Sequence, residues 1–346
     1  MTKRMILDFS KRPLLLAPMA DVTNPAFRML CHEKGADFTF TEMINAAGFL
    51  NGDSFAMDRG ISYDQKPYGI QIVGPSADSI CEAAVGLEEK LRPAVIDINM
   101  GCPSPKILKD KCGAYLLNDT SVPPAIIAKL SENLKTPVTA KIRLYRETER
   151  TVALAKSLED AGAAWISVHA RTAAQGYSGK ANWNAVEQIK ENVSIPVILN
   201  GDIFTPQDLK QAIETGCDGF MIGRGAIGNP GIFEHMKKAL SSDFEESETK
   251  DEAAFQEEFR QRILDFKRYC FLLETYNLYA HVNIKSHAQW FTKGLQHSKD
   301  MRLEIASLQK ETRLRHLNDE EIAESRRVLA GQIVDVLEKY FEKIGK

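Results

Sequence analysis

Residues 94–106 read AVIDINMGCPSPK, an apolar run that passes directly into Asn99 and then into Gly101, Cys102 and Pro103. The isoleucines and the alternating apolar positions favour a buried β-strand that ends near Asn99. Glycine and proline on either side of Cys102 require the backbone to turn there. The thiol is therefore presented at the end of a strand, where a side chain can face a cleft.

Seven further apolar runs resemble the first one, and amphipathic stretches lie between them. Strands that alternate with helices are typical of a parallel sheet. Eight such units within about 230 residues match the TIM (β/α)8 barrel, whereas a doubly wound sheet usually needs fewer strands. We therefore predict an α/β fold built on a TIM barrel. The runs are LLLAPM (14–19), FTFTEM (38–43), GIQIVG (69–74), AVIDIN (94–99), VTAKIR (138–143), WISVHA (165–170), VILNGD (197–202) and GFMIGR (219–224). Helices are predicted over residues 25–35, 77–90, 123–134, 147–161, 184–192, 206–215 and 232–240.

The pattern changes after residue 240. Residues 241–255 read SSDFEESETKDEAAF, an acidic and serine-containing stretch that is typical of a linker. The remaining residues repeat at the helical period and include no further strand, which predicts a four-helix bundle. Its helices are expected over residues 255–276, 280–294, 301–308 and 319–344. We assign residues 1–240 to a catalytic barrel and residues 241–346 to an all-helical domain.

Composition limits the classes of protein to consider. The chain has 346 residues and a formal net charge of -3, which gives no overall sign of a polyanion partner, although a local basic face is compatible with it. The six cysteines form no CxxC pairs, and the N-terminus has no apolar signal segment. Both observations predict reduced thiols in the cytoplasm. No run approaches the ~18 apolar residues of a membrane helix. We expect no membrane partner and, from the cysteine spacing, no metal.

The carboxyl ends of the predicted strands are unusually polar. A TIM barrel builds its active site from these ends, so one ligand contacted from many sides explains the pattern. The ends carry Pro18, Met19, Gln71, Asn99, Lys141, His169, Asn200, Gly223 and Arg224.

The last two units add a phosphate-binding pattern. NGD at 200–202 and GRGAIGNP at 223–230 are glycine-bearing loops, and the second leads into a helix. Backbone N–H groups in such loops hold phosphate, and Arg224 supplies a counter-charge. A buried Lys141 would stabilise negative charge on a bound ring, which Gln71 and Asn99 would orient. The predicted ligand is a phosphorylated ring that accepts negative charge, and FMN is the natural candidate.

Taken together, these blocks resemble the tRNA-dihydrouridine synthase family, flavin enzymes that reduce uridine to dihydrouridine in transfer RNA. The strings LLLAPMADVTNPAFR, QIVG, DINMGCPSPK, CGAYLL, KIRL, SVHARTAAQGYSGKANW, ILNGDI and MIGRGAIGNP occur in the family's order over residues 14–233. The resemblance implies that FMN is contacted by Ala17, Pro18, Met19, Gln71, Lys141, His169, Asn200, Gly201, Asp202, Gly223 and Arg224.

The resemblance also implies a mechanism. NADPH would reduce FMN and leave, and hydride would then pass to C6 of the uracil while Cys102 protonates C5 from the opposite face. An ordinary thiol, with a pKa near ~8.5, is mostly protonated at neutral pH and can act as a general acid. The uracil has to leave its stack to reach a barrel mouth. Cys112, in the following loop, is expected to be a packing residue.

A basic face is predicted in the helical region. Residues 267–315 hold nine Lys or Arg against four Asp or Glu, with aromatic residues among them, which suits phosphate contact and base stacking. The string IKSHAQWFTKGL (284–295) resembles the family's helical-domain motif but has Ser286 where a second basic residue is common. The predicted RNA contacts are Arg171, Tyr177, Lys285, His287 and Lys293.

Three classes of function stay open on the sequence alone. The favoured one is a monomeric RNA-modifying flavoenzyme that uses NADPH and tRNA. A small-molecule FMN oxidoreductase of the dihydroorotate dehydrogenase type shares the barrel and the lysine, but it gives no reason for the helical extension. An RNA-binding protein without catalysis is the third, and the presence of Cys102, Lys141 and His169 argues against it. Ribosomal RNA as the substrate, and the position of the modified uridine, stay open as well.

Overall fold

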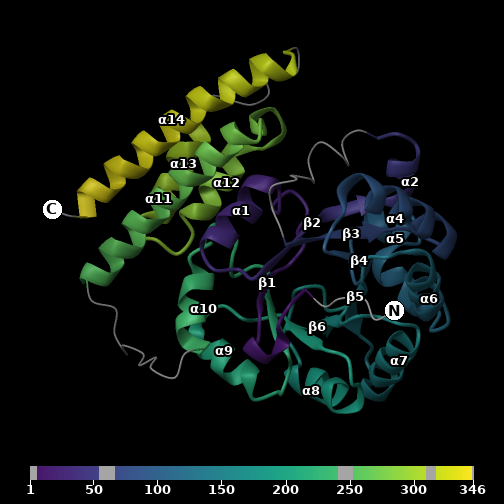
Figure 1. The fold of residues 1–346 in the computed structure, drawn as a ribbon. Coiled ribbons are helices and arrows are strands. Elements are labelled where there is room, and N and C mark those ends of the chain that lie inside the picture. The colour runs from purple at the N-terminus through teal and green to yellow at the C-terminus, as the bar shows by residue number, and fades with distance from the viewer. Residues whose placement is uncertain (1–5, 54–66, 241–251, 309–316, 345–346) are drawn as a thin grey trace.

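Eight parallel strands close into a barrel in the computed structural model, which describes residues 6–53, 67–240, 252–308 and 317–344. Each strand pairs with the next along the chain, and the eighth pairs with the first. The C-terminal helices lie to one side of the barrel (Figure 1). The predicted TIM barrel is confirmed. The strands are β1 (Leu14–Leu16), β2 (Phe38–Asn45), β3 (Tyr68–Val73), β4 (Val95–Met100), β5 (Val138–Leu144), β6 (Ile166–Thr172), β7 (Val197–Asn200) and β8 (Gly219–Ile222).

The seven helices predicted around the barrel are present, with ends that differ by at most two residues. They are α1 (Pro25–Glu33), α4 (Ala77–Leu91), α6 (Val122–Asn133), α7 (Thr148–Asp160), α8 (Trp183–Asn192), α9 (Pro206–Ile213) and α10 (Ile232–Leu240). Prolines at the first turn and side-chain caps explain several starts: Asn24 accepts from the Phe27 N–H, and Thr205 forms a capping box with Asp208. Short elements that we did not predict are η1 (Phe9–Lys11), α2 (Ala46–Leu50), α5 (Pro105–Lys109) and η2 (Gly113–Asn118).

The C-terminal region is helical, as predicted. Within residues 252–308 and 317–344 its helices are α11 (Glu252–Thr275), α12 (Ile284–Phe291), α13 (Ser298–Ser307) and α14 (Asp319–Ile344), and the 3-10 turn η3 (Tyr279–His281) precedes α12. One buried hydrophobic cluster includes strand residues of the barrel and residues of all four helices. The boundary expected at residue 240 coincides with the end of α10 and stays a prediction, because the acidic linker falls mainly on 241–251, outside the described residues.

Alternate residues of each strand face the barrel interior. Their side chains form two levels, an upper one at the carboxyl ends of the strands and a lower one beneath it. The lower level is apolar: Phe38 packs edge-on against Phe40 and Trp165, with ring centroids 5.1 and 6.0 Å apart. A Cβ atom on Gly69 would lie 2.6 Å from the Phe40 ring, so this glycine makes room for the aromatic plug. The upper level is polar and forms the site described below. The plug closes one end of the barrel and leaves the carboxyl ends of the strands for a ligand.

A buried chain of hydrogen bonds joins the barrel to the helical region. The Asn24 side-chain amide donates to the Tyr269 hydroxyl at 2.8 Å, and the hydroxyl lies 2.7 Å from Nδ1 of His287. Nε2 of His287 lies 3.0 Å from the carbonyl oxygen of Asp21. Every atom is satisfied when Tyr269 donates to Nδ1 and Nε2–H donates to Asp21. Burial lowers the pKa of His287 to about 4, so the ring is neutral in this tautomer at physiological pH.

A close backbone contact reinforces this junction. Gly228 has a φ of +68°, and a Cβ atom there would lie 2.2 Å from the carbonyl carbon and oxygen of Trp290 in α12. The carbonyl oxygen of Gly228 accepts from Nη1 of Arg262 in α11 at 2.5 Å. The loop after β8 therefore lies directly against two helices. In the described ranges, no helix combines the length and apolar character needed to cross a membrane.

The Gly228→Ala variant tests this junction. The added methyl group meets the α12 backbone, and the positive φ disfavours alanine, so we expect the free energy of unfolding to fall by at least about 2 kcal/mol. Gly331→Ala is the matched control, because Gly331 is exposed in α14 and a Cβ atom added there meets nothing within 4 Å, so alanine should leave stability equal or higher. Urea unfolding of both variants measures the difference. Equal stability of Gly228→Ala and the wild type would contradict the proposed tight contact.

Candidate active site

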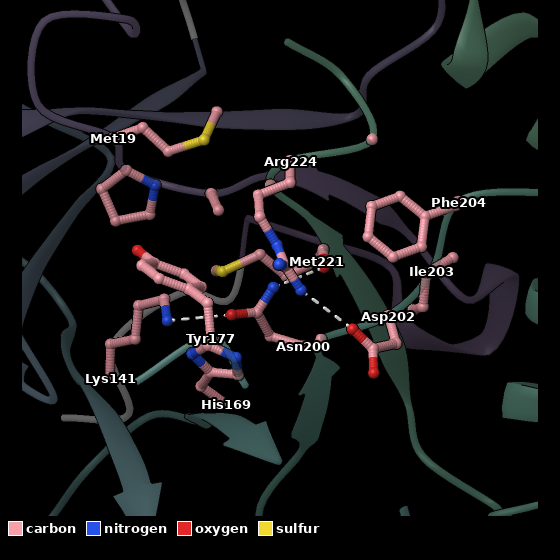
Figure 2. A pocket seen from close by; sticks show the side chains of 15 residues that line it. Met19, Lys141, His169, Tyr177, Asn200, Asp202, Ile203, Phe204, Met221 and Arg224 are labelled. Atoms are coloured by element: carbon pink, nitrogen blue, oxygen red, sulfur yellow. Dashed lines mark hydrogen bonds and ion pairs between the residues drawn. The ribbon is translucent and has the colours of Figure 1, made fainter. Parts of the chain in front are cut away.

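Two adjoining cavities open at the carboxyl ends of the strands. The first, with about 520 Å³ of empty space, is bounded by β1, β7 and β8 and the loops that follow them; the second, with about 1070 Å³, contains Cys102. Lys141, His169, Tyr177 and Arg224 line both, and Figure 2 shows their side chains converging. All residues predicted to contact the cofactor line one or both cavities: Ala17, Pro18, Met19, Gln71, Asn99, Lys141, His169, Asn200, Gly201, Asp202, Gly223 and Arg224.

The loop that carries Cys102 is held by a buried hydrogen-bond network. Oδ1 of Asn99 accepts from the backbone N–H groups of Gly101 and Cys102 at 3.1 and 2.9 Å. The Asn99 amide donates to Oε1 of Gln71 at 2.8 Å, and the Gln71 amide donates to Asp97 at 2.7 Å. Thr139 donates to the other oxygen of Asp97 at 2.7 Å. Both amides are thus engaged within the protein, and they fix the turn that presents the thiol.

Lys141 points into the cavity from the middle of β5. Its Nζ donates to Oδ1 of Asn200 at 3.0 Å, and the Asn200 amide donates to the carbonyl oxygen of Met221 at 2.7 Å (Figure 2). Burial, followed by the nearby Arg143 cation, lowers the pKa of Lys141 to about 8. An anionic group placed against Nζ would relieve this electrostatic cost. The site is therefore built to receive negative charge.

His169 is held as a neutral ring beside these cations. It is 8% exposed, and burial together with the charges of Lys141, Arg143, Arg171 and Arg224 lowers its pKa to about 2. A neutral imidazole offers one donor and one acceptor to a ligand. In the barrel register His169 lies next to Asn200, so the two side chains occupy neighbouring positions on the cavity wall.

The Asp202 carboxylate, in the loop after β7, pairs with two arginines. Its Oδ1 accepts from Arg224 at 2.9 Å, and its Oδ2 accepts from Arg171 and from the Ala181 N–H at 2.7 and 2.8 Å. Two arginines thus balance the charge of this carboxylate. Asp202 lines the first cavity, so its role as a cofactor contact stays a prediction, and its carboxylate also positions Arg224.

Arg171 lies inside the protein rather than at an RNA-facing surface. It is 2% exposed and donates to the carbonyl oxygens of Ser178 and Gly179 as well as to Asp202. These contacts hold the loop after β6, whereas Tyr177 in that loop is 62% exposed and lines both cavities. We correct the expectation for Arg171, which is placed as a loop anchor, and retain Tyr177 as a candidate substrate contact.

The residues expected to bind RNA in the helical region differ in their surroundings. His287 is 3% exposed and both of its ring nitrogens are engaged within the protein, so the structure places it in the packing between the barrel and the helices. Nζ of Lys285 donates to the carbonyl oxygens of Ala306 and Leu308 at the end of α13. Lys293 is exposed.

Cys112 is buried in a small cluster with Val73 and Ile107, as expected of a packing residue, and its thiol pKa is raised by burial to about 11.

Arg143 is a site residue that the sequence analysis did not single out. Nε donates to the carbonyl oxygen of Gly101 at 2.7 Å, and Nη1 donates to those of Thr172 and Gly176 at 3.0 and 2.8 Å. It therefore ties the Cys102 loop to the Tyr177 loop and lines the cavity between them. The available signal was the period of two along β5, since Arg143 lies on the same face as Lys141. Within the described ranges, no group of three or more His, Cys, Asp or Glu could hold a metal ion.

Stability of the Lys141→Met variant tests the burial of this cation. Between pH 8 and about 10.5 the unfolded chain holds a proton that the folded chain has released, so the contribution of Lys141 to stability rises with pH across this window. We expect Lys141→Met to be more stable than the wild type by up to about 2 kcal/mol at pH 7, and the gain to shrink as the pH approaches 10.5. Urea unfolding at pH 7, 8.5 and 10 measures it. Lys156→Met, at an exposed position of α7, controls for loss of a lysine, and a pH-independent gain at Lys141 would refute the assignment.

Comparison with known proteins identifies the family. The family model described as dihydrouridine synthase (Dus) matches residues 15–327. A probable tRNA-dihydrouridine synthase of Aquifex aeolicus (strain VF5) is 39% identical over 236 residues, which cover 67% of this chain and 75% of that protein. A tRNA-dihydrouridine synthase B of Pseudomonas syringae pv. tomato is 38% identical, with 66% and 68% covered, and a probable tRNA-dihydrouridine synthase of Rickettsia prowazekii is 33% identical, with 84% and 89% covered. The chain therefore belongs to the dihydrouridine synthase family of enzymes.

Proposed function

We propose that this protein uses FMN and NADPH to reduce the C5=C6 bond of uridine in tRNA, with Cys102 as the proton donor. The observation that carries the proposal is the shared cavity, in which Cys102 on one wall faces a space also lined by Lys141, His169 and Arg224. Relatives named tRNA-dihydrouridine synthases support tRNA as the substrate. The reaction consumes one hydride from NADPH and one proton, and it yields 5,6-dihydrouridine and NADP⁺.

The residues around the first cavity suit FMN. Lys141 is a half-buried cation whose ammonium group would be stabilised by an anionic edge of the flavin ring. Gly201, at φ +117°, lines the cavity, and so do Gly223 and Gly225. Arg224, between these two glycines, lines it as well. Backbone N–H groups and an arginine are the usual partners of a phosphate. When bound, FMN supplies the hydride transfer between NADPH and C6 of uracil.

Cys102 holds the proton that C5 requires. Its backbone is fixed by Asn99, so Sγ is presented to the cavity by the turn rather than by a flexible loop. Lys141 and Arg143 line the same cavity as Cys102. Solvent then returns the proton to sulfur. The network below Cys102 thus serves positioning, while the thiol serves the chemistry.

RNA has to bring a single base to this opening. A uracil cannot reach the cavity within a stack, so the target nucleotide is extruded and the rest of the RNA is held by shape and backbone contacts. Tyr177 and Arg143 lie beside the opening, and the exposed Lys293 contributes to the helical face. We place this reaction in the cytoplasm, with a monomer as the acting species, residues 1–240 as the catalytic domain and residues 241–346 as the RNA-binding domain.

Replacement of Cys102 by alanine separates the two halves of the reaction. We expect Cys102→Ala to retain flavin and to oxidise NADPH at the normal rate, because it leaves the first cavity unchanged. Dihydrouridine formation on unmodified tRNA should fall by about 100-fold or more, since the proton donor is missing. Stopped-flow reduction of the flavin and mass spectrometry of the RNA measure the two steps.

Cys112→Ala is the matched control, because it removes a buried thiol that lines neither cavity, and it should reduce tRNA at a rate close to that of the wild type. Normal dihydrouridine formation by Cys102→Ala would contradict the assignment of Cys102 as the proton donor. Mapping dihydrouridine in total RNA from cells that lack this protein identifies the target uridine and separates tRNA from ribosomal RNA.

A further inference from the structure

A separate cavity lies at the junction of the barrel and the helical region. Asp21, Asn24 and Glu42 line it on the barrel side, and residues of η3, α12 and α14 line it on the other. Its empty space of about 1110 Å³ is close to that of the cavity that contains Cys102, and it opens to solvent. None of the residues assigned to the cofactor lines it.

Neighbouring residues of two segments line the junction cavity and the catalytic cavity. Along the loop after β1, Ala20 and Val22 line the catalytic cavity, whereas Asp21 between them lines the junction cavity. On β2, Met43 lines the catalytic cavity and Glu42 lines the junction cavity. The loop after β1 and strand β2 therefore form part of the wall of both cavities.

The wall is fixed by hydrogen bonds on both sides. The N–H of Asp21 donates to Oε2 of Glu42 at 2.7 Å, and its carbonyl oxygen accepts from Nε2 of His287. Asp21 adopts a φ of +61°, a conformation that these two bonds hold in place. The spacing between the two cavities is thus set before any ligand binds, which lowers the ordering cost of binding.

The lining of the junction cavity suits an unstacked base. Trp290 contributes an aromatic ring, whose centroid lies 4.3 Å from that of His287. His281, Ser286 and Asn283, whose Oδ1 accepts from the Ser286 N–H, also line the cavity, together with the acidic residues Asp21 and Glu42. An aromatic ring combined with polar groups is the usual way in which proteins hold single nucleotides, whereas an apolar ligand would leave these polar groups unpaired.

We propose that the junction cavity binds the base of a nucleotide adjacent to the target uridine in the same RNA strand. This inference rests on the proposed function. Extrusion of one base removes a stacking partner from its neighbours, and contacts to flanking nucleotides set the sequence context of enzymes that act on extruded bases. A strand that delivers uracil to the catalytic cavity passes over the wall at Asp21, so a neighbouring base reaches the junction cavity. The protein would thus select its uridine partly through the adjacent base.

Abasic RNA tests the proposal without any change in the protein. The substrate is unmodified tRNA with an abasic site on the 5′ or on the 3′ side of the mapped uridine. We expect one of these two RNAs to lower kcat/KM of the wild type by at least about tenfold, because the stacking contact is lost. Reduction of the flavin by NADPH should stay the same with every RNA.

Two variants then assign that loss to the junction cavity. Ser286→Phe fills the cavity and should lower kcat/KM on intact tRNA about tenfold, with no further fall on the sensitive abasic RNA. Gln289→Phe, on the same helix but outside the lining, should behave like the wild type. Insensitivity of the wild type to both abasic sites, or losses in Ser286→Phe that multiply with the abasic loss, would overturn the inference. If the wild type oxidises NADPH but reduces no RNA uridine, the proposed function is wrong. This inference, which rests on it, is then wrong as well.

Discussion

The hydrogen bond between Gln71 and the buried carboxylate of Asp97 is the constraint on which the barrel mouth depends. A carboxylate only accepts, so the Gln71 amide must turn its nitrogen toward Asp97 and its oxygen toward Asn99. Asn99 in turn must direct its own oxygen at the backbone N–H groups of the Cys102 loop. One acceptor in the barrel interior thus sets the orientation of two amides and of the turn beyond them.

Burial raises the pKa of Asp97 to about 6, against the opposing hydrogen bonds of Gln71 and Thr139. The residue is therefore mostly ionised at neutral pH despite its position in the interior, and the network is polarised toward it. The nearby Lys141 ammonium favours the same state. The Lys141 ammonium and the Asp97 carboxylate therefore stabilise each other. The apolar cluster that includes Phe38, Phe40 and Trp165 fills the lower level of the barrel beneath them.

Much of the fold and many candidate site residues could be predicted from local sequence. Apolar runs identified all eight strands, because strands in a parallel barrel are buried on both faces. The strand-end survey led to Lys141 and His169, but it treated each strand as one position. Asp97, Thr139 and Arg143 lie two residues away from Asn99 or Lys141 on the same strand face, and a count of inward-facing positions would have included them.

Other features depended on contacts that no local pattern contains. His287 and Asp21 are 266 residues apart in the chain, yet they share a hydrogen bond. The motif around His287 resembles an RNA-binding sequence, and only the packing of α12 against the barrel shows that the ring faces inward. The same holds for Arg171, whose burial depends on how the loop after β6 folds over it.

The neutral state of the Asn24, Tyr269 and His287 chain has a consequence for ionic strength. Attraction between cationic side chains and RNA phosphates weakens steeply with added salt, because bound counterions are released on association. Hydrogen bonds between uncharged, buried groups are screened far less. The core of the junction should therefore hold its geometry as the salt concentration rises.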